Sequence, residues 1–264
     1  QARMKRYDLV VHFGLDLANP SVQIILNMVH AKQRYLFLKH PTQALPNDVV
    51  MDGHWGYEAD TPAQHYSARH VRFLETLGAP APVTYRYDIH LDPHVPAVLS
   101  TGHKTMVINS QSSAANKSFS LPWLEAFVRA VYTEHPELHM QLLSASPALE
   151  AAMCERFCQH TDRVHVLPFA PTVSPSLAAI QAADWVVTPD TYAVHAASAW
   201  NKPVLALYEP SVLSVDSWEP LSDTYAQLIA PEGKAVSDIE VSVAMQALAH
   251  MLAHPLSKQR VFLN

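Results

Sequence analysis

Asp190, Thr191 and His195 are the residues whose types and spacing most clearly permit chemistry, within the stretch from Trp185 to Pro210. An apolar β-branched run predicts a strand that stops at Thr188-Pro189, and the alanines that follow favour a helix. Asp190 and Thr191 lie where that helix would begin, so either could cap its free N–H groups. A helix start binds anions, because its N–H groups are unpaired and its dipole favours negative charge. The stretch therefore predicts recognition of an anionic group such as phosphate.

The individual roles within this stretch leave alternatives open. His195 lies four residues after Thr191, which puts both on one side of the first helical turns. A protonated His195 could donate to a phosphate oxygen, whereas a neutral one could simply face the core. An ionised Asp190 binds phosphate poorly, so it is better suited to accepting bonds from sugar hydroxyls or to holding the helix start.

A second polar segment follows the predicted strand that ends at Asn109. Ser112, Ser113 and Lys117 lie in it, and small hydroxyls with one lysine can bind phosphate oxygens without a glycine-rich loop. An ordinary polar loop with a solvated lysine is the alternative. Because both segments follow strands of one predicted sheet, we expect Lys117 to face Asp190 at its carboxyl edge.

Regular alternation of strands and helices must position these residues. Strands are predicted at 105–109, 138–143, 164–167, 185–188, 204–208 and 226–230, and helices at 120–134, 147–160, 174–183, 191–200 and 237–253. This alternation predicts a parallel sheet covered on both faces. Right-handed crossovers then bring three strand-following loops to one edge: 109–117, 167–174 and 189–195.

The first part of the chain is less regular. Strands are predicted at 7–13 and 34–38, helices at 21–31 and 61–77, and loop at 40–60. Thr61-Pro62 would open the second helix as cap and first residue. The proline-rich stretch 79–100 is interpreted as a crossing between two domains.

Composition excludes several classes of function. The net charge of −6 argues against a general nucleic-acid binder. The acidic excess lies after residue 90, so an anionic partner would more easily meet the first third. Six glycines form neither a G-x-G-x-x-G nor a Walker-type motif, which weighs against dinucleotide and P-loop folds. No D-x-D pair, a typical metal-binding pattern, follows a predicted strand, and no apolar run reaches transmembrane length. Cys154 and Cys158 are interpreted as reduced thiols on one helix.

Four stretches together resemble the ADP-heptose:lipopolysaccharide heptosyltransferases of glycosyltransferase family 9. VVTPDTYAVHAASAWNKPVLALYEP resembles the family's D-[ST]-G-x-x-H segment and the strand after it. SSAANKSFSLPWLEAF is similar to its [ST]-x-x-K-x-W-P segment, and HYSARHVRFLETLG to its H-x-x-x-R helix. YDLVVHFG resembles a strand late in the family's first domain. The resemblance covers most of the chain.

The resemblance implies an α/β GT-B fold with two Rossmann-like domains, here a partial acceptor-side domain at 1–100 and a nucleotide-sugar domain at 101–264. It implies inverting transfer of heptose from ADP-heptose to an anionic lipopolysaccharide core, without a metal or other cofactor, in the bacterial cytoplasm. Peripheral association with the inner membrane stays open. The catalytic residues would be Lys117, Asp190 and His195. The donor would also contact Ser112, Ser113, Pro171 (with Ala170–Thr172 beside the adenine), Thr191 and Tyr192, and the acceptor His65 and Arg69.

The chain also departs from the family pattern. Tyr192 and Glu209 stand where the family has glycine, His12 stands for an aspartate, and Glu150 is the nearest match to an acid expected after the second strand of the donor domain. The family's first strands and the loop with its proposed general base would precede Gln1. A bulky and an acidic residue near a phosphate site keep two alternatives open: a different sugar donor, or a non-catalytic relative that binds a nucleotide sugar or a partner.

Overall fold

The computed structural model describes residues 6–12, 24, 26, 28–38, 48–52, 65–81, 86–91, 102–158 and 162–263. By its contacts the chain divides into two compact units, Gln1–Gln64 and His65–Asn264. The proposed boundary near residue 100 concerns where the second Rossmann-like domain starts, and it stays a prediction.

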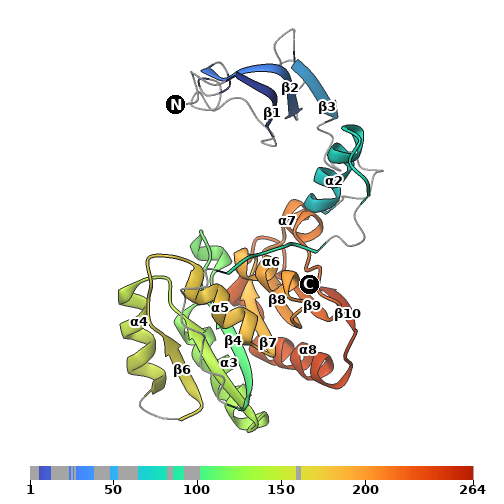
Figure 1. Ribbon diagram of the computed structural model, residues 1–264. Coiled ribbons are helices and arrows are strands. Elements are labelled where there is room, and N and C mark those ends of the chain that lie inside the picture. The colour runs from blue at the N-terminus through green and yellow to red at the C-terminus, as the bar shows by residue number, and fades with distance from the viewer. Residues whose placement is uncertain are drawn as a thin grey trace. The chain divides into compact units, whose positions relative to one another are not determined.

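The first unit contains a three-stranded parallel sheet in the order β1-β2-β3 (Figure 1). Its strands are β1 (Arg6–His12), β2 (His30–Leu38) and β3 (Asp48–Asp52). β2 begins at His30, so the helix predicted through residue 31 is wrong at its end. β3 was predicted as loop, because a short run of three apolar residues between two aspartates is a weak strand signal.

The second unit is built on seven strands. They are β4 (Lys104–Asn109), β5 (Leu138–Leu143), β6 (Val164–Leu167), β7 (Trp185–Pro189), β8 (Val204–Tyr208), β9 (Tyr225–Ile229) and β10 (Lys258–Phe262). They pair in parallel in the order β10-β9-β8-β7-β4-β5-β6. The carboxyl ends of all seven therefore meet at one edge.

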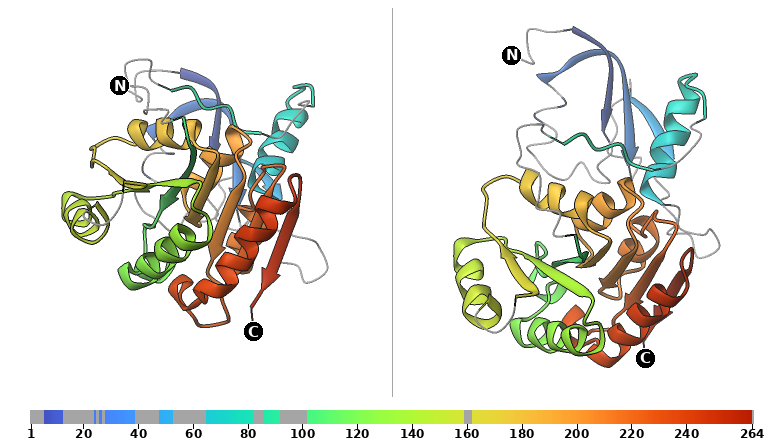
Figure 2. Two further views of the ribbon diagram at one scale, coloured as in Figure 1. Left: turned by 90° about the horizontal axis from the view of Figure 1, so that it is seen from below. Right: turned by 60° about the horizontal axis from the view of Figure 1, so that its bottom comes forward.

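Helices cover both faces of this sheet. They are α3 (Leu121–Glu134), α4 (Pro147–Met153), α5 (Ser174–Ala182), α6 (Tyr192–Ala199), α7 (Val212–Ser217) and α8 (Val241–Ala253), with short turns η3 (Ala115–Lys117), η4 (Cys154–Cys158) and η5 (Val236–Asp238). A further helix, α2 (Tyr66–Thr76), belongs to the same unit. α3 and α8 lie on one side and α5 and α6 on the other (Figure 2). Side chains alternate along β4 accordingly, because Met106 and Ile108 join the core under α3 and α8, whereas Val107 joins the core under α5 and α6.

The predicted α/β alternation is confirmed from residue 105 onward, with strand ends shifted by at most a residue or two. α6 ends where Asn201 adopts a φ of +53°, as the Asn-Lys-Pro sequence predicts. β10 and α7 were not predicted, because neither has an apolar run or helical periodicity. The predicted helix 147–160 is instead α4 followed by the π-helical turn η4.

α2 begins later than the sequence suggests. His65 is its N-cap and accepts from the Ser67 N–H, so His65 precedes the helix that carries Arg69. The predicted start at Thr61-Pro62 lies outside the described residues. The helix ends before Gly78, whose φ of +89° suits only glycine without strain.

Candidate functional site

The loop after β4 presents Lys117 at the carboxyl edge. The Phe119 N–H donates to the Ser110 carbonyl at 2.8 Å, and the Ser112 N–H donates to Ser118 Oγ at 2.9 Å. These bonds close the loop on itself. η3 at its far end then carries Lys117.

Lys117 meets two carboxylates from neighbouring strands. Its Nζ lies 2.8 Å from Glu209 Oε1 and 3.9 Å from Asp190 Oδ2. β4, β7 and β8 are adjacent in the sheet, so the segments after their ends lie side by side. The three side chains are 24%, 20% and 13% exposed, in the order Lys117, Glu209, Asp190. The structure thus brings Lys117 and Asp190 together, as expected from the parallel topology.

A buried amide organises the start of α6. Asn109 Nδ2 lies 3.1 Å from Thr188 Oγ1 and 3.0 Å from Thr191 Oγ1, and Asn109 is only 4% exposed. Thr191 in turn accepts from the Ala193 N–H, which makes it the N-cap of α6. From the sequence, Asn109 was expected only as the last residue of a strand. An amide at the end of a buried strand was the signal that could have found it.

Removing the Thr191 hydroxyl should destabilise the second unit. We expect Thr191→Val to lower the free energy of unfolding by about 1 kcal/mol, since it removes a helix cap and an acceptor for Asn109. Urea unfolding measures this loss. Thr133→Val is the control, because the exposed Thr133 hydroxyl donates to the Arg129 carbonyl within α3, away from the start of α6. Equal losses in the two variants would show that the cap contributes nothing.

The loop between β6 and α5 reaches the same edge. Tyr192, at the start of α6, is hydrogen-bonded to Ser176 in α5. The Phe169 N–H donates to Glu150 Oε2 at 2.8 Å, which ties the loop containing Pro171 to α4. All three predicted loops therefore lie together, and Glu150 serves as an anchor for one of them.

His195 is held in an aromatic environment rather than an ionic one. Its ring centroid lies 5.2 Å from that of Tyr87 and 5.3 Å from that of Trp218. Burial, aided by nearby His65, lowers the pKa of His195 to about 4. The ring is therefore neutral at pH 7 in the unliganded protein, and a role for His195 at phosphate stays a prediction. Its Nδ1 is buried and without a hydrogen-bond partner among the described residues.

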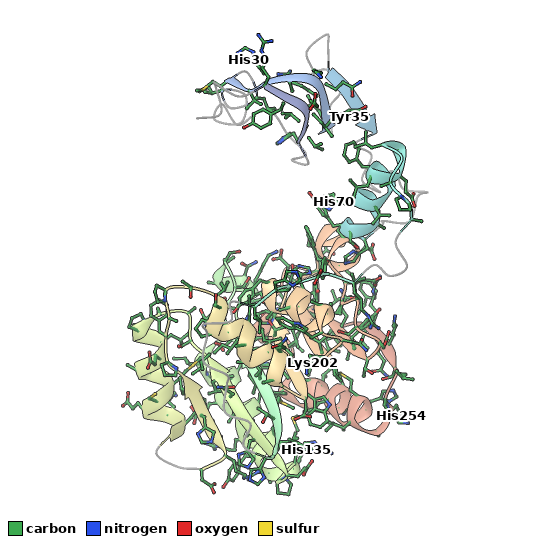
Figure 3. The ribbon with its side chains drawn as sticks, in the orientation of Figure 1. His30, Tyr35, His70, His135, Lys202 and His254 are labelled. Carbon is green, nitrogen blue, oxygen red and sulfur yellow. The ribbon has the colours of Figure 1, made fainter. Side chains whose placement is uncertain are left out.

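Ser112 and Ser113 line an open hollow whose lining includes neither Asn116 nor Lys117. It has a volume of about 590 Å³. The hollow is bounded by the loop from Gln111 to Leu121 and by Ala235 and Ser237 before α8. It lies at the carboxyl edge, opposite His135, which precedes β5 and is drawn at the bottom of the second unit in Figure 3.

The two residues expected on the acceptor side are placed only in part. His65 Nε2 lies 3.1 Å from the Glu219 carbonyl and 3.5 Å from the Tyr87 hydroxyl, so the ring is engaged within its own unit. Arg69 lies in α2, and its side chain is outside the described part of the structure.

Two further observations concern metals and membranes. Within the described ranges, no group of three or more His, Cys, Asp or Glu side chains is arranged to hold a metal ion. None of the helices described has both the length and the apolar character needed to cross a membrane.

A parallel α/β unit with a lysine, a helix start and polar loops at the carboxyl edge has the architecture of Rossmann-like nucleotide-binding proteins. The chain belongs to glycosyltransferase family 9, because the profile of that family, described as glycosyltransferase family 9 (heptosyltransferase), matches residues 29–245. The predicted family and enzyme class, glycosyltransferase, are thereby confirmed. No curated protein matches the sequence closely enough to count as a relative.

Solved structures of heptosyltransferases share the fold. E. coli heptosyltransferase WaaC with ADP aligns with a TM-score of 0.66 at 14% identity, over 95% of this chain and 74% of its own. A glycosyltransferase family 9 protein from Veillonella parvula aligns with a TM-score of 0.70 at 15% identity, over 94% of this chain and 74% of its own. E. coli ADP-heptose lps heptosyltransferase II aligns with a TM-score of 0.62 at 17% identity, over 94% of this chain and 77% of its own. The predicted GT-B type of α/β fold is confirmed.

Proposed function

We propose that this chain transfers heptose from ADP-heptose to a lipopolysaccharide core acceptor, with inversion and without a metal or other cofactor. The observation that carries the proposal is the approach of Lys117 to Asp190 beside the capped start of α6, with Nζ and Oδ2 3.9 Å apart. A cation and free helix N–H groups at one edge of a parallel sheet suit a diphosphate.

The chemistry requires stabilisation of a departing nucleotide diphosphate. Negative charge grows on the leaving group in the transition state, so a positioned cation and helix N–H groups lower the barrier. Lys117 supplies the cation, and Ser112 and Ser113 supply hydroxyl donors. Asp190 accepts from sugar hydroxyls, and His195 contributes a neutral imidazole at the same helix.

The remaining roles are proposed from the resemblance to the family. The loop containing Pro171 would lie beside the adenine, with Tyr192 between it and the phosphates. Arg69 would attract an anionic core saccharide from the acceptor side, with His65 holding the start of its helix. The proposed location is the cytoplasm, where the protein would meet such an acceptor at the cytoplasmic face of the inner membrane.

Solved structures of similar proteins support ADP-heptose as the donor. WaaC is described with ADP and with ADP-2-deoxy-2-fluoro heptose, and a second E. coli enzyme is described as an ADP-heptose lps heptosyltransferase. These are statements about those proteins. They make ADP the first nucleotide to test on this chain.

Titration calorimetry with ADP, UDP and GDP tests the proposal. Binding of ADP in preference to the other two is the expected result. Preference for UDP or GDP would replace the proposal with a transferase for another donor. Failure to bind any of the three would point to the non-catalytic relative.

Activity should not depend on a divalent cation. We expect transfer in the presence of EDTA to equal transfer without it, because Lys117 and the α6 N–H groups are proposed to stabilise the diphosphate. The measurement is release of ADP from ADP-heptose with a heptose-free core acceptor. Loss of activity in EDTA, restored by Mg²⁺ or Mn²⁺, would contradict a metal-independent mechanism.

A further inference from the structure

Glu209 uses both of its carboxylate oxygens inside the candidate site. Oε1 lies 2.8 Å from Lys117 Nζ, and Oε2 accepts from Asn116 Nδ2 at 2.7 Å. Asn116 and Lys117 are consecutive residues of η3, so the Glu209 carboxylate contacts two neighbouring side chains of the turn that carries the lysine. At 20% exposure Glu209 is well shielded from solvent.

The charge balance of this arrangement opposes the binding of an anion. Lys117 is shared between Glu209 and Asp190, which gives one positive and two negative charges within about 4 Å of its Nζ. The Lys117 ammonium donates to the nearer carboxylate, at a distance typical of a charge-assisted hydrogen bond. A diphosphate would have to displace that carboxylate or share the lysine with it, against the repulsion of both.

We propose that Glu209 is an internal competitor for the nucleoside diphosphate, and that it sets the affinity and selectivity of the site for phosphate. Its carboxylate occupies the anion position of Lys117 in the unliganded protein. The diphosphate enters by exchange, in which Lys117 transfers its hydrogen bond from Glu209 to a phosphate oxygen. This inference rests on the proposed function, because it takes the ligand to be a nucleoside diphosphate at Lys117.

A structural role for Glu209 makes a different prediction. If Glu209 merely held η3 in place, removing its charge would lower the stability of the protein and weaken the binding of every ligand at the site. If Glu209 competes with phosphate, its carboxylate should instead weaken the binding of only those ligands that carry phosphate. Glu209→Gln separates the two roles, because glutamine keeps the size and an oxygen acceptor for Asn116 but loses the negative charge.

The experiment measures the Kd of ADP and of adenosine by calorimetry at fixed ionic strength. The variants are wild type, Glu209→Gln, Lys117→Ala, Lys117→Ala/Glu209→Gln, and Glu134→Gln as the matched control. Glu134 is exposed at the end of α3, so it undergoes the same change of charge away from the site. Thermal unfolding of each variant reports whether the fold is retained.

We expect Glu209→Gln to bind ADP about tenfold more tightly or better, the scale of one charge-assisted contact. The Kd of adenosine should not change, and Glu134→Gln should match wild type. The gain from Glu209→Gln should be smaller in the Lys117→Ala background, because the competition for the lysine is then absent and only the repulsion by the carboxylate is relieved. Equal ADP affinity in wild type and Glu209→Gln would overturn the inference and leave the proposed function standing. So would a gain of equal size in the presence and in the absence of Lys117. If neither protein binds ADP, UDP or GDP, the proposed function itself fails.

Discussion

Replacement of Lys117 by alanine is expected to weaken the binding of ADP by about 1.5–3 kcal/mol, which is about a 10- to 150-fold increase in Kd. Lys117 is the cation that the structure places at the capped start of α6, near Asp190. Its removal takes away a charge-assisted bond to the diphosphate and leaves two carboxylates that repel it. Calorimetry with ADP at constant ionic strength measures the change.

Lys104→Ala is the matched control for this variant. The two lysines flank opposite ends of β4, because Lys104 begins the strand and Lys117 lies in the loop after it. Lys104 is exposed and lies over the Trp185 ring, so its loss changes net charge without touching the carboxyl edge. If Lys104→Ala raised the Kd as much as Lys117→Ala, the effect would be one of net charge and not of a phosphate site.

His195 should make the second unit lose stability on acidification. Its pKa is about 4 in the folded protein, against an ordinary value of 6.5. The unfolded chain therefore takes up a proton at a higher pH than the folded one, so stability falls as the pH drops from 6.5 towards 4. The full effect of a shift of this size is about 3 kcal/mol, reached below pH 4.

Urea unfolding at pH 7, 5.5 and 4 measures this loss. His195→Leu keeps an apolar side chain in place and cannot titrate, so its free energy of unfolding should fall less than that of wild type by up to about 3 kcal/mol. Burial also lowers the pKa of His139, but that contribution is common to both proteins and cancels. His90→Gln is the control, because the His90 side chain is 89% exposed. A slope of stability against pH that is identical in His195→Leu and wild type would contradict a buried neutral imidazole.

The approach of Lys117 to Asp190 could be predicted because it depends only on topology. Each residue follows a strand of one parallel sheet, and parallel strands end at a common edge. β4 and β7 are neighbours in that sheet, which brings the two loops within reach of each other. No side-chain detail was needed for that step.

The ionic partner of Lys117 could not be predicted in the same way. Glu209 was recognised as a departure from the family's glycine, but its position after β8 allowed it to point to solvent or to the site. The packing of the folded chain determines which of these two orientations occurs. In the structure the Glu209 side chain contacts Asn116 and Lys117.

The environment of His195 could not be predicted from the sequence either. Its two ring partners, Tyr87 and Trp218, come from distant segments with no periodic relation to α6. From the sequence, a protonated His195 at phosphate and a neutral, core-facing His195 were both open. Long-range packing keeps it neutral, because burial disfavours the protonated form.

The most direct test of the account is a structure of this chain with ADP bound. The account predicts the diphosphate at the carboxyl edge of the seven-stranded sheet, within hydrogen-bond distance of Lys117 Nζ and of an N–H group in the first turn of α6. The adenine should lie against the loop that contains Pro171, and Lys117 should no longer contact Glu209. ADP bound at that edge without contact to Lys117, or bound elsewhere on the chain, would contradict the assignment of this site to the donor.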